Sequence, residues 1–96
     1  MWIITKDLIS DCVPDGTSRV GVHSADYDAE RFAVLPTLPV RVLDDDGEVY
    51  YEGRATRERI LDSYEDRAFD FLDWAMADAG CTELQYKEGR GSWETL

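Results

Sequence analysis

Short runs of alternating apolar and polar residues recur along the chain, and this spacing of two is typical of β-strands whose two faces meet different surroundings. Such runs predict strands over residues 2–9, 20–22, 82–86 and 92–96. Polar, glycine-containing stretches at 10–18 and 88–91 have the composition of turns.

The clearest unit covers residues 39–54, where strand-like runs at 40–43 and 49–52 flank Asp44-Asp45-Asp46-Gly47-Glu48. An Asp-Gly pair between two such runs is a strong signal of a hairpin with a type I′ turn, because both central residues of that turn need positive φ. The sequence therefore predicts a β-hairpin here.

Two segments have helical spacing instead. Residues 27–33 predict a short helix with Ser24 or Asp26 as its N-cap and Pro36 as its end, because a residue before proline is pushed out of the α region. A longer helix is predicted to end at Gly80, which suits a left-handed C-cap, and to begin near Thr56 or, as the alternative, at an N-cap formed by Ser63 or Asp62. At about 100° per residue, one face of this helix gathers Tyr64, Ala68, Phe71, Leu72, Ala75 and Ala79.

These elements predict an α+β fold. We expect a small mixed or antiparallel sheet of about five strands, including the 40–54 hairpin, packed on one long amphipathic helix with a second short helix. The chain of 96 residues shows no linker, repeat or low-complexity segment, so residues 1–96 are expected to form a single compact domain.

The chain is strongly acidic, which limits its binding partners. Ten Lys and Arg face 21 Asp and Glu, for a formal charge of -11. This charge repels the phosphate backbone of a nucleic acid, so no direct nucleic-acid binding is expected. No apolar run approaches the roughly 20 residues of a membrane helix, and the start does not read as a signal peptide. The expected location is the cytoplasm.

Residue types suited to catalysis or metal binding form no pattern. No spacing ties a serine or cysteine to the single histidine, His23. Cys12 and Cys81 lie far apart and are expected to be reduced thiols, although a bridge between them stays open. The acids at 44–46 are consecutive, whereas a calcium-binding loop alternates its ligands. We expect no enzymatic activity, no catalytic residues, no metal and no cofactor.

The acids themselves gather in two places. The acids of the predicted hairpin are Asp44, Asp45, Asp46, Glu48 and Glu52. Tyr50 lies among them and could anchor a contact with a partner. Three more follow helical spacing opposite the apolar face: Asp66, Asp70 and Asp73. Like charges at this spacing repel by a few tenths of a kcal/mol per pair, a cost that folding does not explain.

Two interpretations of this charge compete. In the first, carboxylates on the hairpin tip and along the helix imitate the phosphates of DNA and bind the basic groove of a nucleic-acid-binding protein. In the second, the acids serve solubility or adaptation to salt in an accessory or regulatory protein; a homodimer that buries an exposed sheet edge is one form of this hypothesis. The sequence leaves the oligomeric state open.

Three stretches, WIITKDLI, RVLDDDGEVYYEGRA and DAGCTELQYKEGRGSWETL, resemble small acidic proteins of phages and other mobile elements, among them anti-CRISPR proteins. This resemblance implies a non-enzymatic inhibitor that blocks target DNA binding by a CRISPR effector complex. Its partner would be the Cascade subunit surface that reads the PAM, the short DNA motif beside the target. A phage-encoded protein would act in the host cytoplasm.

Overall fold

The computed structural model describes residues 1–9, 18–61 and 66–96, without the side chains of Asp66 and Arg67. Within them, five strands form one antiparallel sheet in the order β1-β3-β2-β4-β5. The strands are β1 (Trp2–Asp7), β2 (Thr37–Leu43), β3 (Val49–Thr56), β4 (Glu83–Tyr86) and β5 (Glu94–Thr95). The predicted α+β class with about five strands is confirmed.

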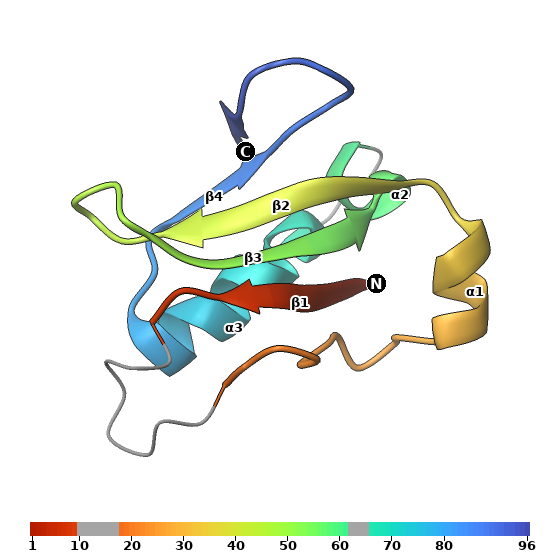
Figure 1. Cartoon of the computed structure of the whole chain (residues 1–96), viewed down its shortest axis with the longest axis horizontal. Coiled ribbons are helices and arrows are strands. Elements are labelled where there is room, and N and C mark those ends of the chain that lie inside the picture. The colour runs from red at the N-terminus through yellow and green to blue at the C-terminus, as the bar shows by residue number, and fades with distance from the viewer. Residues whose placement is uncertain (10–17, 62–65) are drawn as a thin grey trace.

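Helices cover one face of this sheet. They are α1 (Ala29–Val34), α2 (Arg57–Leu61), the 3-10 helix η2 (Asp66–Phe69) and α3 (Asp70–Ala79). Figure 1 shows α2 and α3 behind the sheet, with α1 standing at the end opposite the β2–β3 hairpin. The face of the sheet toward the viewer has no helix against it in this view.

The core lies between the sheet and α3, because the strands point every second side chain toward that helix. Val40, Val42 and Tyr51 are fully buried there. They meet the buried face of α3, formed by Phe71, Leu72 and Ala75. Trp2 of β1 stacks on Phe71 with ring centroids 4.8 Å apart, which ties the edge strand to the helix.

The prediction of one long helix from near Thr56 to Gly80 is wrong. The segment holds α2, η2 and the ten-residue α3 as separate elements. Arg59 and Asp70 show why, since their side chains form a 2.6 Å hydrogen bond. Eleven residues of continuous helix would separate them by about 16 Å along the axis. The apolar periodicity survives this corner, because Ile60 of α2 and the face of α3 pack into the same core.

The end of α3 follows the prediction. Gly80 has φ +78° and ψ +24°, and its N–H donates to carbonyl groups of Ala75 and Met76. This is the left-handed cap expected of glycine. Helix α1 also ends as predicted, at Leu35 before Pro36.

The N-cap of α1 differs from the prediction. Asp28 holds this position, and its carboxylate accepts the N–H groups of Glu30 and Arg31. Ser24 instead accepts the N–H of Trp2 at 3.0 Å, and Asp26 pairs with Arg59. Both expected caps are thus engaged by distant parts of the chain, which local spacing does not reveal.

The strand predicted over residues 20–22 does not form. The segment runs beside β1, with one bridge between Ile3 and His23 and a hydrogen bond from Ile4 N–H to Val22 O. It covers much of the edge of β1. At the opposite edge, β5 is only two residues long. Neither edge offers the long unpaired strand that edge-to-edge dimerisation would use.

The β1–β3 pairing contains an irregularity beside a glycine. The register shifts between Ile4 and Lys6, and Gly53 of β3 lies opposite Ile4. A Cβ atom on Gly53 would fall 2.2 Å from the carbonyl oxygen of Ile3. This close approach of two backbones requires glycine.

Candidate acidic interface at the β2–β3 hairpin

The predicted hairpin is present and joins the two central strands of the sheet. Its tip is closed by backbone hydrogen bonds from Gly47 N–H to Asp44 O and from Asp44 N–H to Glu48 O. The carboxylate of Asp44 also accepts the N–H groups of Asp46 at 2.9 Å and Glu48 at 2.8 Å. The tip is therefore held by four hydrogen bonds around one aspartate.

The predicted type I′ turn is wrong. Gly47 has φ +80°, but no described residue other than glycine has positive φ, so Asp46 does not. The tip is a three-residue loop that ends in a left-handed glycine. Asp44 explains the difference, because its side chain satisfies the amide groups of a turn that contains one left-handed residue instead of two.

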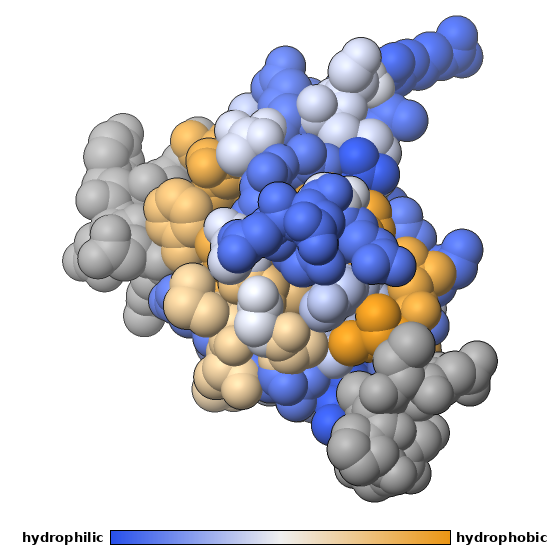
Figure 2. Space-filling view, turned by 90° about the vertical axis from the view of Figure 1, so that its left-hand side faces the viewer, coloured by the Kyte–Doolittle hydropathy of each residue, from blue (hydrophilic) through white to orange (hydrophobic). Residues whose placement is uncertain are grey.

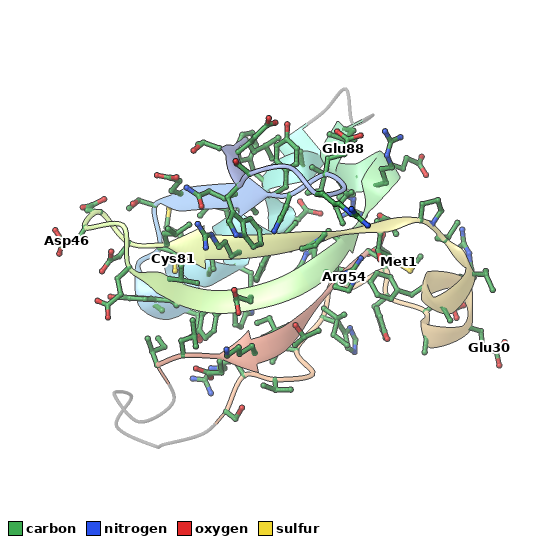
Figure 3. All side chains as sticks on the ribbon, turned by 45° about the horizontal axis from the view of Figure 1, so that its top comes forward. Met1, Glu30, Asp46, Arg54, Cys81 and Glu88 are labelled. Carbon is green, nitrogen blue, oxygen red and sulfur yellow. The ribbon has the colours of Figure 1, made fainter. Side chains whose placement is uncertain are left out.

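Three acids of the tip point into solvent. Asp45, Asp46 and Glu48 are all exposed, and none forms an ion pair with another residue that the structure describes. Figure 2 faces this end of the molecule and shows hydrophilic residues at its centre with hydrophobic ones beside them. Figure 3 shows Asp46 at the extreme end, directed away from the body. We call Asp45, Asp46 and Glu48 the acidic tip.

Asp44 and Tyr50 support the acidic tip from behind. Hydrogen bonds to the carboxylate of Asp44 hold the pKa of this group below its ordinary value, and the bond from the Glu48 amide has the largest effect. The Tyr50 hydroxyl hydrogen-bonds to Asp44, and this bond raises the pKa of the phenol. Tyr50 is half-buried against the edge of the core, so part of its ring is accessible beside the tip.

The structure gives other predicted contact residues partners within the protein. Glu52, on β3, lies 4.0 Å from the ammonium of Lys6. Asp70 accepts from Arg59, whose guanidinium also binds Asp26. These carboxylates are already balanced by a cation and offer less charge to a partner than the acidic tip does.

The predicted stripe of acids on one helix does not form as expected. The side chain of Asp66 lies outside the described residues, and its backbone belongs to η2. Asp70 and Asp73 fall in the first turn of α3, where the helix dipole favours negative charge. Their positions thus have a folding explanation.

Sequence reasoning missed a polar cluster in which the buried Tyr51 meets two partly exposed charged side chains. The hydroxyl of Tyr51 donates to Asp78 at 2.6 Å, and Arg19 reaches the same carboxylate oxygen at 3.3 Å. Burial, then the bond to Asp78, raises the pKa of Tyr51 well above its ordinary value. Two features of the sequence pointed to this cluster. Tyr51 lies in a predicted strand, and Asp78 lies near the C-terminal end of a helix, where the helix dipole disfavours an acid.

The remaining chemistry-bearing groups form no reactive constellation. Cys81 is fully buried, and burial raises the pKa of its thiol to about 11, so it is a poor nucleophile at neutral pH. Cys12 lies outside the described residues. In the part of the chain that the structure describes, no group of three His, Cys, Asp or Glu is placed to hold a metal ion. None of its helices is long and apolar enough to span a membrane.

Comparisons with protein-family models, with curated proteins and with solved structures find no significant match to this chain.

Substituting Asp44 tests how the tip is held. Alanine at this position is expected to speed hydrogen exchange at the amides of Asp46 and Glu48 several-fold, because it removes their acceptor. Asp44→Asn keeps an oxygen and should preserve most of the protection. Since the pKa of Asp44 is lowered, this contribution is present above its unfolded pKa and is lost as pH falls through the folded pKa.

Asp45→Ala is the matched control, because the Asp45 side chain makes no hydrogen bond with the residues described. Exchange measured by NMR should be unchanged in this variant. Equal exchange rates in Asp44→Ala and Asp45→Ala would show that the Asp44 side chain does not hold the tip.

Proposed function

We propose that this protein is a non-enzymatic inhibitor that inserts its acidic tip into the basic DNA-binding groove of another protein. The observation that carries the proposal is the contrast among its acids. Asp45, Asp46 and Glu48 stand exposed on a protruding hairpin and form no ion pair with the residues that the structure describes, while acids such as Asp26 and Asp70 are paired with Arg59.

The shape of the hairpin supports this role. Asp44 fixes the tip through two amide groups, so little conformational freedom remains to be lost on binding. The three carboxylates project from one four-residue segment, so they form a compact cluster of negative charge, as the phosphates of a duplex do. Tyr50 adds a partly accessible aromatic ring beside the tip, and tyrosine is favoured at the centres of interfaces.

The resemblance to anti-CRISPR proteins makes the PAM-reading surface of Cascade the first partner to test. A groove that binds DNA phosphates carries the positive charge that the acidic tip requires. Opposite charges would speed the encounter, and binding should weaken as salt screens them.

Reversing the charge of the tip should abolish inhibition. The triple variant Asp45→Lys, Asp46→Lys, Glu48→Lys is expected to bind purified Cascade about 100-fold more weakly, because each cation would face a cationic groove at a cost of about 1 kcal/mol or more. The measurement is fluorescence anisotropy of labelled target DNA on Cascade, with the unlabelled protein as competitor.

A matched control separates the tip from the total charge. Glu30, Glu58 and Glu94 are exposed acids elsewhere on the chain and outside the predicted contact residues, and reversing all three changes the formal charge of -11 by the same amount. This control should inhibit like the wild type. If both triple variants lose inhibition equally, net charge and not the tip is responsible. If the wild type leaves DNA on Cascade, the proposed partner is wrong.

A second candidate function is an acidic accessory or regulatory protein whose charge serves solubility or adaptation to salt. The observation that favours it is that several acids have folding roles, such as the cap formed by Asp28 and the bond from Tyr51 to Asp78. Thermal melting in low and molar salt discriminates, since strong stabilisation by salt favours this candidate.

A further inference from the structure

The face of the sheet that carries no helix holds a group of cations. The register places Arg54 of β3 opposite Pro39 of β2, and the carbonyl of Pro39 accepts the backbone N–H of Lys87 at 3.1 Å. Arg41 follows Pro39 by two positions on β2, and Lys87 follows Gln85, the partner of Arg41, by two positions, so all three cations share one side of the sheet. Opposite and alternate positions are about 5–7 Å apart. We call Arg41, Arg54 and Lys87 the basic face.

The cations of the basic face form no ion pair with the residues that the structure describes. The Nε of Arg41 donates to the amide oxygen of Gln85 at 2.8 Å, and its guanidinium lies 4.2 Å from the ring centre of Trp93. Arg54 donates to the hydroxyl of Thr37 at 2.9 Å and to its carbonyl at 3.2 Å. All of these partners are uncharged, although the chain has 21 acids for its ten Lys and Arg.

The carboxylates nearest to the basic face do not neutralise it. Two of them pair with other cations: Glu52 with Lys6 at 4.0 Å, and Glu88 with Arg57 at 2.8 Å. The third, Glu83, accepts hydrogen bonds from uncharged side chains on the same side of the sheet. Three cations thus face one carboxylate that has no ion pair among the described residues, so the basic face keeps an excess of positive charge on an acidic protein.

We propose that the basic face binds the acidic tip of a second copy of this chain. The two surfaces have complementary charge, because each presents three charged side chains that form no ion pair with the described residues. Figure 3 shows Asp46 directed away from the body of the molecule and Arg54 well behind it on the sheet. The tip therefore does not reach the basic face of its own chain, and the contact joins different copies.

This self-association regulates access to the acidic tip. The tip and the basic face are different patches, so two copies either exchange tips reciprocally or join head to tail. In both arrangements, a tip that lies on the basic face of another copy is hidden from any other partner. The inference rests on the proposed function in taking the tip as a contact surface, but it does not depend on which protein the tip inhibits.

NMR spectra of the ¹⁵N-labelled protein at increasing concentration test the contact. It is small compared with stable interfaces, so we expect a dissociation constant of about 0.1–1 mM. Between about 0.05 mM and about 1 mM, the amide signals of the acidic tip and of the basic face should shift together. Ionic strength is held at about 0.15 M, because salt screens both the attraction within the contact and the repulsion between two molecules of charge -11.

A charge swap separates this contact from any other. The tip variant carries Asp45→Lys, Asp46→Lys and Glu48→Lys, and the face variant carries Arg54→Glu and Lys87→Glu. Each variant alone should self-associate at least about tenfold more weakly, because like charges then meet in the contact. A mixture of the two variants should recover the association, because each tip again meets a face of opposite charge.

Matched controls change the net charge equally at other places. Glu30, Glu58 and Glu94, all changed to Lys, match the tip variant. Arg31→Glu with Arg90→Glu matches the face variant, since these arginines lie on α1 and in the turn after β4 and form no ion pair with the described residues. Both controls should keep the shifts at the tip and the basic face. Circular dichroism checks that every variant keeps the fold.

Three results would overturn the proposal. These are wild-type spectra that do not change up to about 1 mM, shifts confined to other parts of the chain, or a mixture of the tip and face variants that associates no better than either alone. All three are read from the protein by itself, whereas the proposed function is tested by displacement of DNA from Cascade. A failure of this contact is therefore distinguishable from a failure of the proposed function.

Discussion

Gly53→Ala is expected to destabilise the protein by about 3 kcal/mol or more, a large effect for the addition of one methyl group. The new Cβ would lie 2.2 Å from the carbonyl oxygen of Ile3 and 3.2 Å from Cα of Ile4. All of these are backbone atoms, so the clash is relieved only by moving β1 away from β3. In a protein of this size the melting temperature should fall by more than about 12 °C.

Gly47→Ala is the appropriate comparison. Gly47 has φ +80° but no atom within 4 Å of the position of a Cβ, so alanine there adds only backbone strain of about 1–2 kcal/mol. Thermal melting of both variants should place Gly53→Ala well below Gly47→Ala. The reverse order would contradict the close approach of β1 and β3.

Arg59→Ala is expected to destabilise the protein by about 2–3 kcal/mol at neutral pH. Its side chain is only 10% exposed and binds Asp26 and Asp70 at 2.5 and 2.6 Å. Breaking a fully buried pair costs about 3–5 kcal/mol, and the half-exposed carboxylates here regain some hydration. Arg59→Lys should lose an intermediate amount, because one ammonium does not reproduce the fork that reaches both acids.

The same variant should change the response to acid. Partial burial acts to raise the pKa of Asp26, but a hydrogen bond from Ser24 and the charges of the Met1 amino group and Arg59 hold it below its ordinary value. The resulting stability is present above the unfolded pKa and is lost as pH falls through the folded pKa. Urea unfolding should therefore show wild type and Arg59→Ala converging in acid.

Arg57→Ala is the control for this experiment. Arg57 lies in the same helix α2 and pairs with Glu88, but both side chains are about half exposed. Surface pairs of this kind contribute about 0–1 kcal/mol. A loss at Arg57 as large as that at Arg59 would show that burial of the Arg59 network is not what stabilises it.

Local signals predicted the elements that depend on local chemistry. The hairpin between residues 40 and 54, the stop at Pro36 and the cap at Gly80 follow from residue types at fixed offsets, and all are present. Apolar periodicity does not predict the break between α2 and α3, because the buried residues of both helices face the same core and so keep a helical spacing in the sequence. Arg59 stabilises the change of direction between α2 and α3. Its guanidinium binds Asp70, 11 residues later in the sequence, and Asp26, 33 residues earlier.

The candidate site was predicted with similar limits. Composition identified which residues are acidic, but the role of each acid depends on which cation or amide the fold brings beside it. Asp44, Asp70 and Asp78 carry the same side chain and respectively hold a turn, bind Arg59 and accept from Tyr51. Asp45, Asp46 and Glu48 have no such partner among the described residues, and the proposed function is assigned to them for that reason.

The strand order has a consequence for synthesis on the ribosome. Trp2 of β1 pairs with Ala55 of β3, so β1 emerges about 50 residues before its partner strand exists. At about 5–20 residues per second, it waits roughly 3–10 s with the apolar sequence Trp2-Ile3-Ile4 uncovered. During that interval these apolar residues lack the partner strand that they have in the folded protein, which exposes the nascent chain to aggregation.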